Sequence, residues 1–212
     1  SLAVSAVGFT PVTTARAAAL VVNSLDDVDD TVCDSTHCSL REAIDDANSV
    51  VSDDSITFSV SGTIHLTGML PMVTDNLTID GGNNITISGD TDNNNAGDVP
   101  ILKVFTGVSV ILQNLTLTRG NDTTNGGGAI LNNGTLTIEN STVSNSTTSA
   151  INQGGGGIYN SGGNATLNLT NSTVSGNTAT FYGGGIGNIG GTVNITNSTI
   201  SGNNSTTNSG GG

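Results

Sequence analysis

The sequence predicts an all-β fold: a single-stranded, right-handed parallel β-helix, or β-solenoid, with a short capping helix near its N-terminus. Three observations predict it, namely a repeat of nearly constant length, short runs of alternating β-branched residues, and glycine-rich segments between them. Glycine accounts for 30 of the 212 residues, and aromatic residues make up only 3%. Such a composition is unlike that of an ordinary globular domain. It favours thin layers of short strands over packed helices.

The repeat is clearest in three blocks, 126–153, 154–182 and 183–209, of 28, 29 and 27 residues. Each block opens with a glycine run, passes through a strand-like segment and reaches the motif Asn-Ser-Thr-Val/Ile-Ser. A period of this length indicates stacked supersecondary units. Strands that repeat in register stack in parallel about 4.8 Å apart and point equivalent side chains inward in every coil. Weaker earlier copies lie at 76–89 and 108–121.

The turns of the repeat carry asparagine and glycine. The first asparagine of the motif is Asn140, Asn171 or Asn197, and we expect these amides to stack and hydrogen-bond to one another. We expect the glycine runs to adopt positive φ or to let coils approach closely, because a Cβ atom would clash there. Both features have a structural explanation without any ligand.

A short helix is predicted just before the coils. Residues 39–42, Ser-Leu-Arg-Glu, match a capping box. Leu40, Ala43, Ile44 and Ala47 then form one apolar stripe along a helix. The first coil of a solenoid exposes apolar surface and strand edges, so we expect this helix to cover that end.

Export is predicted from the N-terminal residues. Segment 1–9 is similar to the apolar region of a signal peptide, and the alanines at 17–19 fit the small-residue pattern of a cleavage site. Residues 1–19 are therefore expected to be a signal-peptide remnant or a retained N-terminal arm. The cap is expected at 20–52 and the coils at 53–212. No apolar run approaches the roughly 20 residues of a membrane span, so no direct membrane span is expected.

Two cysteines, Cys33 and Cys38, enclose four residues. This spacing predicts a disulfide loop in an oxidising compartment. The alternative is a zinc site in which His37 is the third ligand.

The net charge is −13, from 17 acidic and 4 basic residues. This balance makes binding to nucleic acid or to anionic lipid electrostatically unfavourable. The acids concentrate at 26–30, 45–46 and 53–54, and we interpret them as solvated, solubilising charges.

Residues 38–44 read Cys-Ser-Leu-Arg-Glu-Ala-Ile and are followed by Asp-Ser-Ile-Thr-Phe at 54–58 and Asn-Leu-Thr-Ile-Asp-Gly at 76–81. With the later repeats, the chain from about residue 21 onward resembles the CSLREA-domain parallel β-helix proteins of bacterial surfaces. The heptapeptide is specific, whereas the repeats are shared with many autotransporter-like β-helices. The resemblance implies a secreted or cell-surface β-helix, commonly part of a longer protein, and it identifies no activity or ligand.

Polysaccharide lyases and hydrolases share this architecture, so an enzyme is the main alternative. Glycoside hydrolysis requires two carboxylates that face one groove. From Asn121 onward the only acids are Asp122 and Glu139, and there is no Lys, Arg or His. We therefore expect no enzymatic activity. If the chain were an enzyme, its candidate catalytic acids would be Asp75, Asp80, Asp90 and Asp98.

The best candidate metal site is segment 90–98, whose alternating oxygen ligands suit Ca²⁺. Its glycine, Gly97, comes later than the glycine of an EF-hand loop. Apart from Ca²⁺, no cofactor is expected. His65 lies in a strand-like segment and is expected to be a structural residue. The four predicted ligands are Asp90, Asp92, Asn94 and Asp98.

Many Asn-x-Ser/Thr sequons occur in this Asn- and Thr-rich chain, and composition alone produces many of them. Glycosylation requires that the source organism glycosylates surface proteins and that the asparagine points outward. The candidates are Asn76, Asn84, Asn114, Asn133, Asn164 and Asn194.

These observations favour a non-enzymatic structural or adhesive solenoid that is secreted or lies on the cell surface. The glycines at 210–212 stand where a further coil would begin, so we expect an open last coil. Its partner would be a second copy, stacked head to tail into a filament, or further repeats of a longer chain. Surface glycans are also expected partners. A glycan- or ice-binding solenoid is a further alternative, which regular rows of threonine on a flat face would favour.

Overall fold

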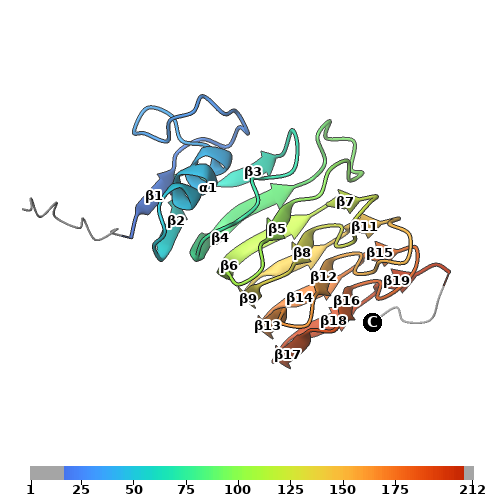
Figure 1. Ribbon diagram of the computed structural model, residues 1–212. Helices are drawn as coiled ribbons and strands as arrows, with labels where there is room; N and C mark the ends of the chain where they lie inside the picture. Colours follow the sequence, from blue (N-terminus) through green and yellow to red (C-terminus); the bar gives the residue numbers. More distant parts are fainter. Residues whose placement is uncertain (1–16, 208–212) are drawn as a thin grey trace, which may run out of the picture.

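The computed structural model describes residues 17–207, which form a β-solenoid of stacked parallel strands with one short helix at its N-terminal end (Figure 1). Every pair of named strands that hydrogen-bonds is parallel. Each coil consists of consecutive strands of the same chain. The predicted fold class, an all-β parallel β-helix with a capping helix, is confirmed.

Three parallel sheets make up the sides of the solenoid. The largest has eleven strands: β1 (Ala19–Val22), β2 (Asp54–Phe58), β3 (Gly62–His65), β4 (Leu77–Ser88), β6 (Ser109–Thr118), β9 (Thr135–Glu139), β10 (Thr142–Ser144), β13 (Thr166–Thr170), β14 (Thr173–Ser175), β17 (Thr192–Thr196) and β18 (Thr199–Ser201). A second sheet holds β5 (Leu102–Val104), β8 (Ile130–Asn132), β12 (Ile158–Ser161) and β16 (Ile186–Ile189). The third holds β7 (Asn121–Asp122), β11 (Thr147–Thr148), β15 (Thr178–Ala179) and β19 (Asn204–Ser205).

The predicted repeat blocks stack in register. Thr135 pairs with Thr166, and Thr166 pairs with Thr192, so the three coils match strand for strand. Alternate residues of these strands face inward: Leu136 and Ile138 are fully buried between coils. The core is thus a column of Leu, Ile and Val layers about 4.8 Å apart. The end of the third block, residue 209, lies outside the described residues.

A left-handed asparagine forms the corner between β9 and β10. Asn140 has φ of 48°, and Asn171 and Asn197 at the equivalent corners have φ of 49°. Asparagine tolerates this conformation better than other residues with a Cβ atom, which explains its recurrence. The prediction that these three amides form a ladder is wrong. Their side chains are exposed and make no hydrogen bond to one another, because the left-handed backbone turns them toward solvent.

The amide ladder lies instead on the inside of the second sheet. Asn132 Nδ2 donates to Asn160 Oδ1 at 2.7 Å, and Asn160 Nδ2 donates to Asn188 Oδ1 at 2.8 Å. Asn132 and Asn160 are fully buried, and a buried amide requires such partners.

The serine of the Asn-Ser motif forms a second inner ladder. Ser172 Oγ accepts the backbone N–H of Ser141, and Ser198 Oγ accepts the backbone N–H of Ser172, both at 3.1 Å. The hydroxyls of Ser141 and Ser172 donate in turn to the carbonyls of Glu139 and Thr170. Each serine therefore satisfies a backbone donor of the preceding coil.

The glycine runs behave as predicted. Gly155 has φ of +71°, and a Cβ atom there would lie 2.0 Å from the Ile158 carbonyl oxygen. Gly128 has no positive φ, but a Cβ atom would lie 2.2 Å from the Thr147 carbonyl oxygen. Backbone conformation requires the first glycine and close backbone approach requires the second.

Helix α1 (Leu40–Ser49) is the predicted cap. Its capping box is complete: Ser39 Oγ accepts the N–H of Glu42, and Glu42 Oε2 accepts the N–H of Ser39. The predicted stripe, Leu40, Ala43, Ile44 and Ala47, is buried, and the helix lies beside β1 and β2 at the end of the solenoid (Figure 1).

One predicted boundary needs correction. Ala19 starts β1 and pairs with Ser55 of β2, so the first strand of the solenoid precedes the helix and crosses the expected division between residues 19 and 20. Residues 1–16 of the expected signal-peptide segment or arm, and the glycines at 210–212, lie outside the described residues.

Candidate functional site

One side of the solenoid carries two parallel rows of polar residues, all of them Thr or Ser except His65, which we name the hydroxyl face. It lies on β3, β4, β6, β10, β14 and β18, where strand pairing aligns residue with residue. The first row is Thr63, Thr86, Thr116, Thr142, Thr173 and Thr199. The second row, two positions along each strand, is His65, Ser88, Thr118, Ser144, Ser175 and Ser201.

Strand alternation produces this face. The residue between the two rows is apolar in every coil, and it is buried in the core, as in Val143 and Val174, except for Ile200 in the last described coil, which is half-buried. Its neighbours must then point outward. Coils stack about 4.8 Å apart, and alternate residues of a strand are about 6.7 Å apart, so the hydroxyls form a regular grid.

The side chains of the grid are more exposed to solvent in the C-terminal coils than in the N-terminal ones. Ser88 and Thr118 are buried, and Ser88 Oγ accepts the N–H of Asp90 at 3.3 Å. Thr199 and Ser201 are exposed. Within residues 17–207, none of the six threonine hydroxyls of the first row makes a hydrogen bond to the protein. They are therefore available to an outside partner that offers regularly spaced polar groups.

The predicted Ca²⁺ loop brings three of its four residues together. Carboxylate oxygens of Asp90, Asp92 and Asp98 lie within 4.8 Å of one another. Asn94 lies in the same loop, but its side-chain oxygen accepts the N–H of Ala96 at 2.7 Å.

The oxygens of this loop already have partners. Asp90 is fully buried and accepts the N–H groups of Asn94 and Asn95, and Arg119 Nε lies 4.0 Å from its Oδ2. The N–H and hydroxyl of Thr91 both donate to Asp98 and hold the pKa of its carboxyl below the usual value. Ca²⁺ takes six to eight oxygen ligands, and these internal bonds compete for them. Ca²⁺ binding at this loop stays a prediction.

The four candidate acids of an enzyme do not share one groove. Asp98 lines a pocket of about 290 Å³ together with Asp122 and Lys103. Asp75 accepts the N–H of Ser52 at 2.7 Å. Asp80 accepts hydrogen bonds from the Gly82 N–H and from the side-chain amide of Asn114 in the next coil. Asp90 accepts the N–H groups of its own loop.

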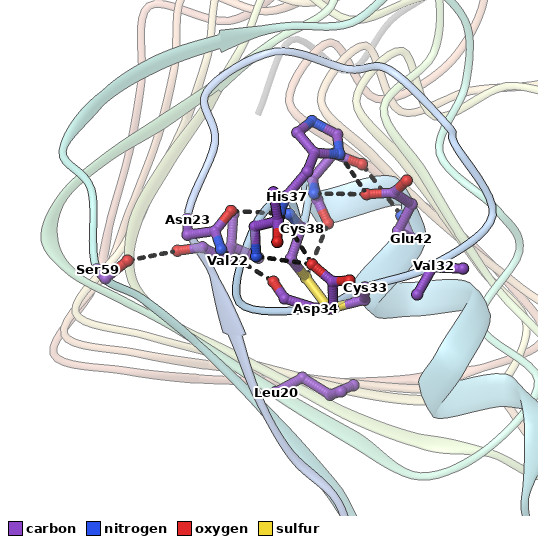
Figure 2. The surroundings of a disulfide bond; sticks show 12 residues. Leu20, Val22, Asn23, Val32, Cys33, Asp34, His37, Cys38, Glu42 and Ser59 are labelled. Carbon is purple, nitrogen blue, oxygen red and sulfur yellow. Dashed lines mark hydrogen bonds and ion pairs between the residues drawn. A yellow bond between two sulfur atoms is a disulfide. The ribbon is translucent and has the colours of Figure 1, made fainter.

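Cys33 and Cys38 form the predicted disulfide (Figure 2). The alternative, a zinc site built from both thiolates and His37, is wrong because the two sulfur atoms are bonded to each other. A disulfide is typical of proteins in oxidising compartments. The helix of the described residues is too short to cross a membrane.

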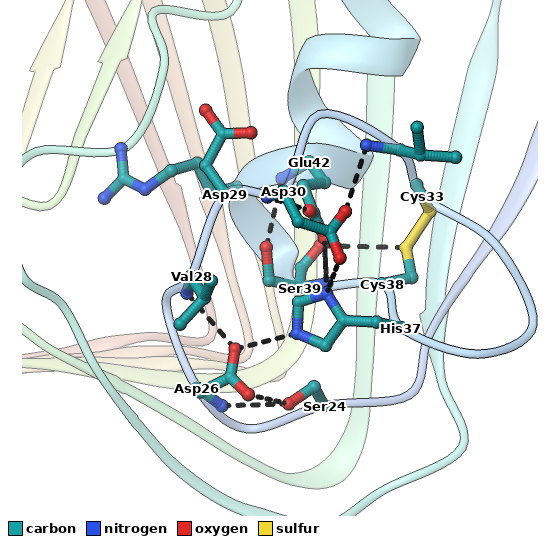
Figure 3. Close-up of polar contacts among 12 residues, drawn as sticks. Ser24, Asp26, Val28, Asp29, Asp30, Cys33, His37, Cys38, Ser39 and Glu42 are labelled. Atoms are coloured by element: carbon teal, nitrogen blue, oxygen red, sulfur yellow. Dashed lines mark hydrogen bonds and ion pairs between the residues drawn. A yellow bond between two sulfur atoms is a disulfide. The ribbon is translucent and has the colours of Figure 1, made fainter.

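The acidic run at 26–30 is more than a solvated charge cluster. His37 lies among three carboxylates: its Nε2 is 3.0 Å from Asp26 Oδ1, and its Nδ1 is 3.2 Å from Glu42 Oε2 and 3.4 Å from Asp30 Oδ2 (Figure 3). Asp27 is buried and ion-paired with Arg41. The interpretation as solvated charge is therefore wrong for Asp27, whereas Asp26, Asp29 and Asp30 are exposed.

These contacts shift the pKa values of His37 and Glu42 in opposite directions. The hydrogen bond to Asp26 raises the pKa of His37 above its usual value, with further contributions from Glu42 and Asp30. Burial raises the pKa of Glu42, but the N–H groups of Ser39 and Asp30 outweigh it and lower the pKa overall.

The predicted glycosylation candidates differ in exposure. Asn84, Asn164 and Asn194 are exposed, whereas Asn76, Asn114 and Asn133 are half-buried. The Nδ2 groups of Asn76 and Asn114 also donate to Asp53 and Asp80. His65 is a strand residue of β3, as predicted, and its Nδ1 lies 2.9 Å from the Asp90 carbonyl oxygen.

Two features escaped sequence reasoning. The threonine rows are visible as Thr-x-Ser at 142–144, 173–175 and 199–201, but their extension to Thr63 depends on register with β3. The acids around His37 had no sequence signal, because a loop brings them together.

No protein-family model, no curated protein and no solved structure matches the chain.

Proposed function

We propose that the protein is a non-enzymatic, extracellular structural or adhesive solenoid that associates end to end. The observation that carries the proposal is the unequal burial of equivalent core residues. Ile138 and Leu169 are 0% and 1% exposed, whereas Ile195, the next residue in the same column, is 50% exposed. Ile195 lies on the last coil within residues 17–207, and a further coil, of the same chain or of a second copy, would cover it.

The outer edge of this coil also offers hydrogen-bonding groups. In the inner coils, the backbone N–H of Ser141 and of Ser172 reaches the serine of the next coil. Ser198 repeats the same arrangement at the edge, and its N–H has no partner within residues 17–207. A further coil, from a second copy or from more repeats, would satisfy that donor and cover Ile195. Among residues 17–207, β1 is the edge strand at the opposite end of the largest sheet.

Head-to-tail contact of this kind is heterologous and does not close, so it produces a filament. The test is sedimentation and light scattering of the purified chain over a range of concentrations. Particle mass is expected to rise with concentration. Ile195→Lys places a charge in the contact and should abolish assembly, whereas the matched variant Thr170→Lys, on the outward side of β13, should assemble normally. A monomer at all concentrations, or a closed dimer, contradicts the proposal.

The hydroxyl face favours a second candidate function, binding to a regularly repeating partner such as ice or a crystalline glycan. The supporting observation is the in-register row of six threonines whose hydroxyls have no partner within residues 17–207. Rigid, uncharged hydroxyls at fixed spacing recognise ordered water or sugar hydroxyls without first losing side-chain freedom.

This candidate is tested by pull-down on insoluble polysaccharides and by an assay of ice recrystallisation. Thr142→Lys and Thr173→Lys, which interrupt the grid, are expected to abolish binding. Thr170→Lys, on β13 and across the Asn171 corner from the hydroxyl face, serves again as the control. This second function is excluded if the unaltered chain binds no polysaccharide and does not affect ice recrystallisation. It is also excluded if Thr142→Lys and Thr173→Lys bind as well as the unaltered chain.

A further inference from the structure

The imidazole of His37 has one nitrogen without a hydrogen-bond partner. Its Nδ1 is buried from solvent and makes no hydrogen bond. It faces Glu42 Oε2 at 3.2 Å and Asp30 Oδ2 at 3.4 Å, as Figure 3 shows. A buried polar atom without a hydrogen bond requires an explanation, and here it lies beside two carboxylate oxygens.

The other ring nitrogen explains how Nδ1 can carry a free lone pair. Nε2 of His37 lies 3.0 Å from Asp26 Oδ1, and an N–H on Nε2 that donates to this carboxylate leaves Nδ1 unprotonated. Histidines that bind metals almost always donate their second ring N–H to a carboxylate or carbonyl, which fixes the ring orientation. Asp26 supplies that contact.

The separations of the donor atoms fit a bound ion. For a tetrahedral ion with bonds of about 2.0–2.2 Å to nitrogen and oxygen, neighbouring ligand atoms lie about 3.3–3.6 Å apart. The distances from His37 Nδ1 to Asp30 and Glu42, 3.4 and 3.2 Å, are close to this range. One nitrogen and two oxygens are a donor set that Zn²⁺ accepts.

Different parts of the protein hold His37, Glu42 and Asp30 in position. His37 precedes the disulfide-bonded Cys38, whose N–H donates to Asn23 Oδ1 at 2.7 Å. Glu42 is fixed by the capping box of α1. Its Oε1 also accepts the N–H of Asp30 at 2.7 Å.

We propose that Asp30, His37 and Glu42 bind one Zn²⁺ ion, with Asp26 as a positioning residue. The ion links the N-terminal loop to the first turn of the capping helix and leaves a coordination position for water. Negative charge favours this occupant: three carboxylates surround the imidazole, and the nearby Arg41 guanidinium is already paired with Asp27.

A proton is the competing occupant of Nδ1, because protonated His37 would pair with the same carboxylates. Zn²⁺ must displace that proton, so its affinity should fall as pH decreases from 8 to 6. If a proton alone occupies the site, Zn²⁺ shows no specific binding at either pH.

The test is calorimetric titration of the oxidised, chelator-treated chain with ZnCl₂ at pH 7.5. One equivalent is expected to bind, and His37→Gln should abolish this binding. Asp26→Asn keeps the three ligands and should weaken binding by about 10- to 100-fold. Glu139→Gln, on β9 and outside both acidic loops, is the matched control and should bind as the unaltered chain does. Circular dichroism of each variant checks that it is folded.

X-ray absorption at the zinc edge gives a readout that does not depend on affinity. The expected first shell contains nitrogen and oxygen only, with one imidazole. The proposal is overturned if the unaltered chain binds no Zn²⁺, if Asp26→Asn and Asp30→Asn bind it with unchanged affinity, or if the first shell contains sulfur.

Discussion

Arg41 and Asp27 form a two-pronged ion pair between the capping helix and the loop before it. Arg41 Nε and Nη2 donate to the two carboxylate oxygens of Asp27 at 3.1 and 2.6 Å. Asp27 also accepts the N–H and hydroxyl of Thr67, and Arg41 donates to the carbonyls of Gly68 and Met69. The pair thus joins the loop, α1 and the segment after β3.

Removing either partner of this pair should destabilise the cap. Arg41→Ala leaves the Asp27 carboxylate buried without its counter-ion, and we expect a loss of about 3–5 kcal/mol in the free energy of unfolding, measured in urea. Arg41→Lys keeps the charge but lacks the planar fork, so it should restore only part of the loss. The double variant Asp27→Ala/Arg41→Ala should cost less than the sum of the two single variants; additive losses would show that the pair is not coupled.

The inner serine ladder makes a prediction for Ser172. Ser172→Ala removes the acceptor for the N–H of Ser141, which is buried between coils. Leaving a buried donor unpaired costs about 1–3 kcal/mol. Ser175→Ala, on the outward side of the next strand, should change stability by less than about 0.5 kcal/mol. Equal urea midpoints for the two variants would contradict the ladder.

The glycine runs make a prediction for Gly155. In Gly155→Ala the residue keeps φ of +71° and its Cβ atom meets the Ile158 carbonyl oxygen. Backbone strain alone costs about 1–3 kcal/mol, and the steric clash adds to it, so the thermal midpoint should fall by several degrees. At Gly68 a Cβ atom would meet nothing within 4 Å, so Gly68→Ala is the control that should melt near the unaltered chain.

The carboxyl group of Asp80 should make the free energy of unfolding depend on pH in the acidic range. The Asn114 amide, and then the Gly82 N–H, hold the pKa of its carboxyl below the ordinary value of 3.8. The folded pKa is lower than the unfolded one, so this contribution is complete above pH about 4–5 and is lost as pH falls through the folded pKa. Asp80→Asn should therefore reduce the difference in urea midpoint between pH 6 and pH 3. An unchanged difference would contradict this role.

Local patterns were sufficient to predict the architecture. The capping box of Ser39 and Glu42 and the apolar stripe of α1 depend on neighbours within a few residues, so the sequence contains the whole signal. The same holds for the coils, because each repeat meets only its neighbours and alternation fixes which side chains face inward. The disulfide between Cys33 and Cys38 follows from their short spacing.

The candidate sites depend on three-dimensional relationships that short patterns do not contain. Asn140 and Asn132 are both recurrent asparagines, but only the backbone conformation decides that the first faces solvent and the second joins the buried ladder. Asp26 and Asp27 are adjacent in the chain, yet one contacts His37 and the other Arg41. Loop folding decides such partners, and composition does not.

The end-to-end association of the solenoid is tested most directly by electron microscopy of the purified chain at high concentration. The account predicts unbranched fibres with the width of one solenoid, and it predicts that Ile195→Lys yields only isolated particles. Uniform single particles of the unaltered chain, with the mass of a monomer in light scattering, would contradict it.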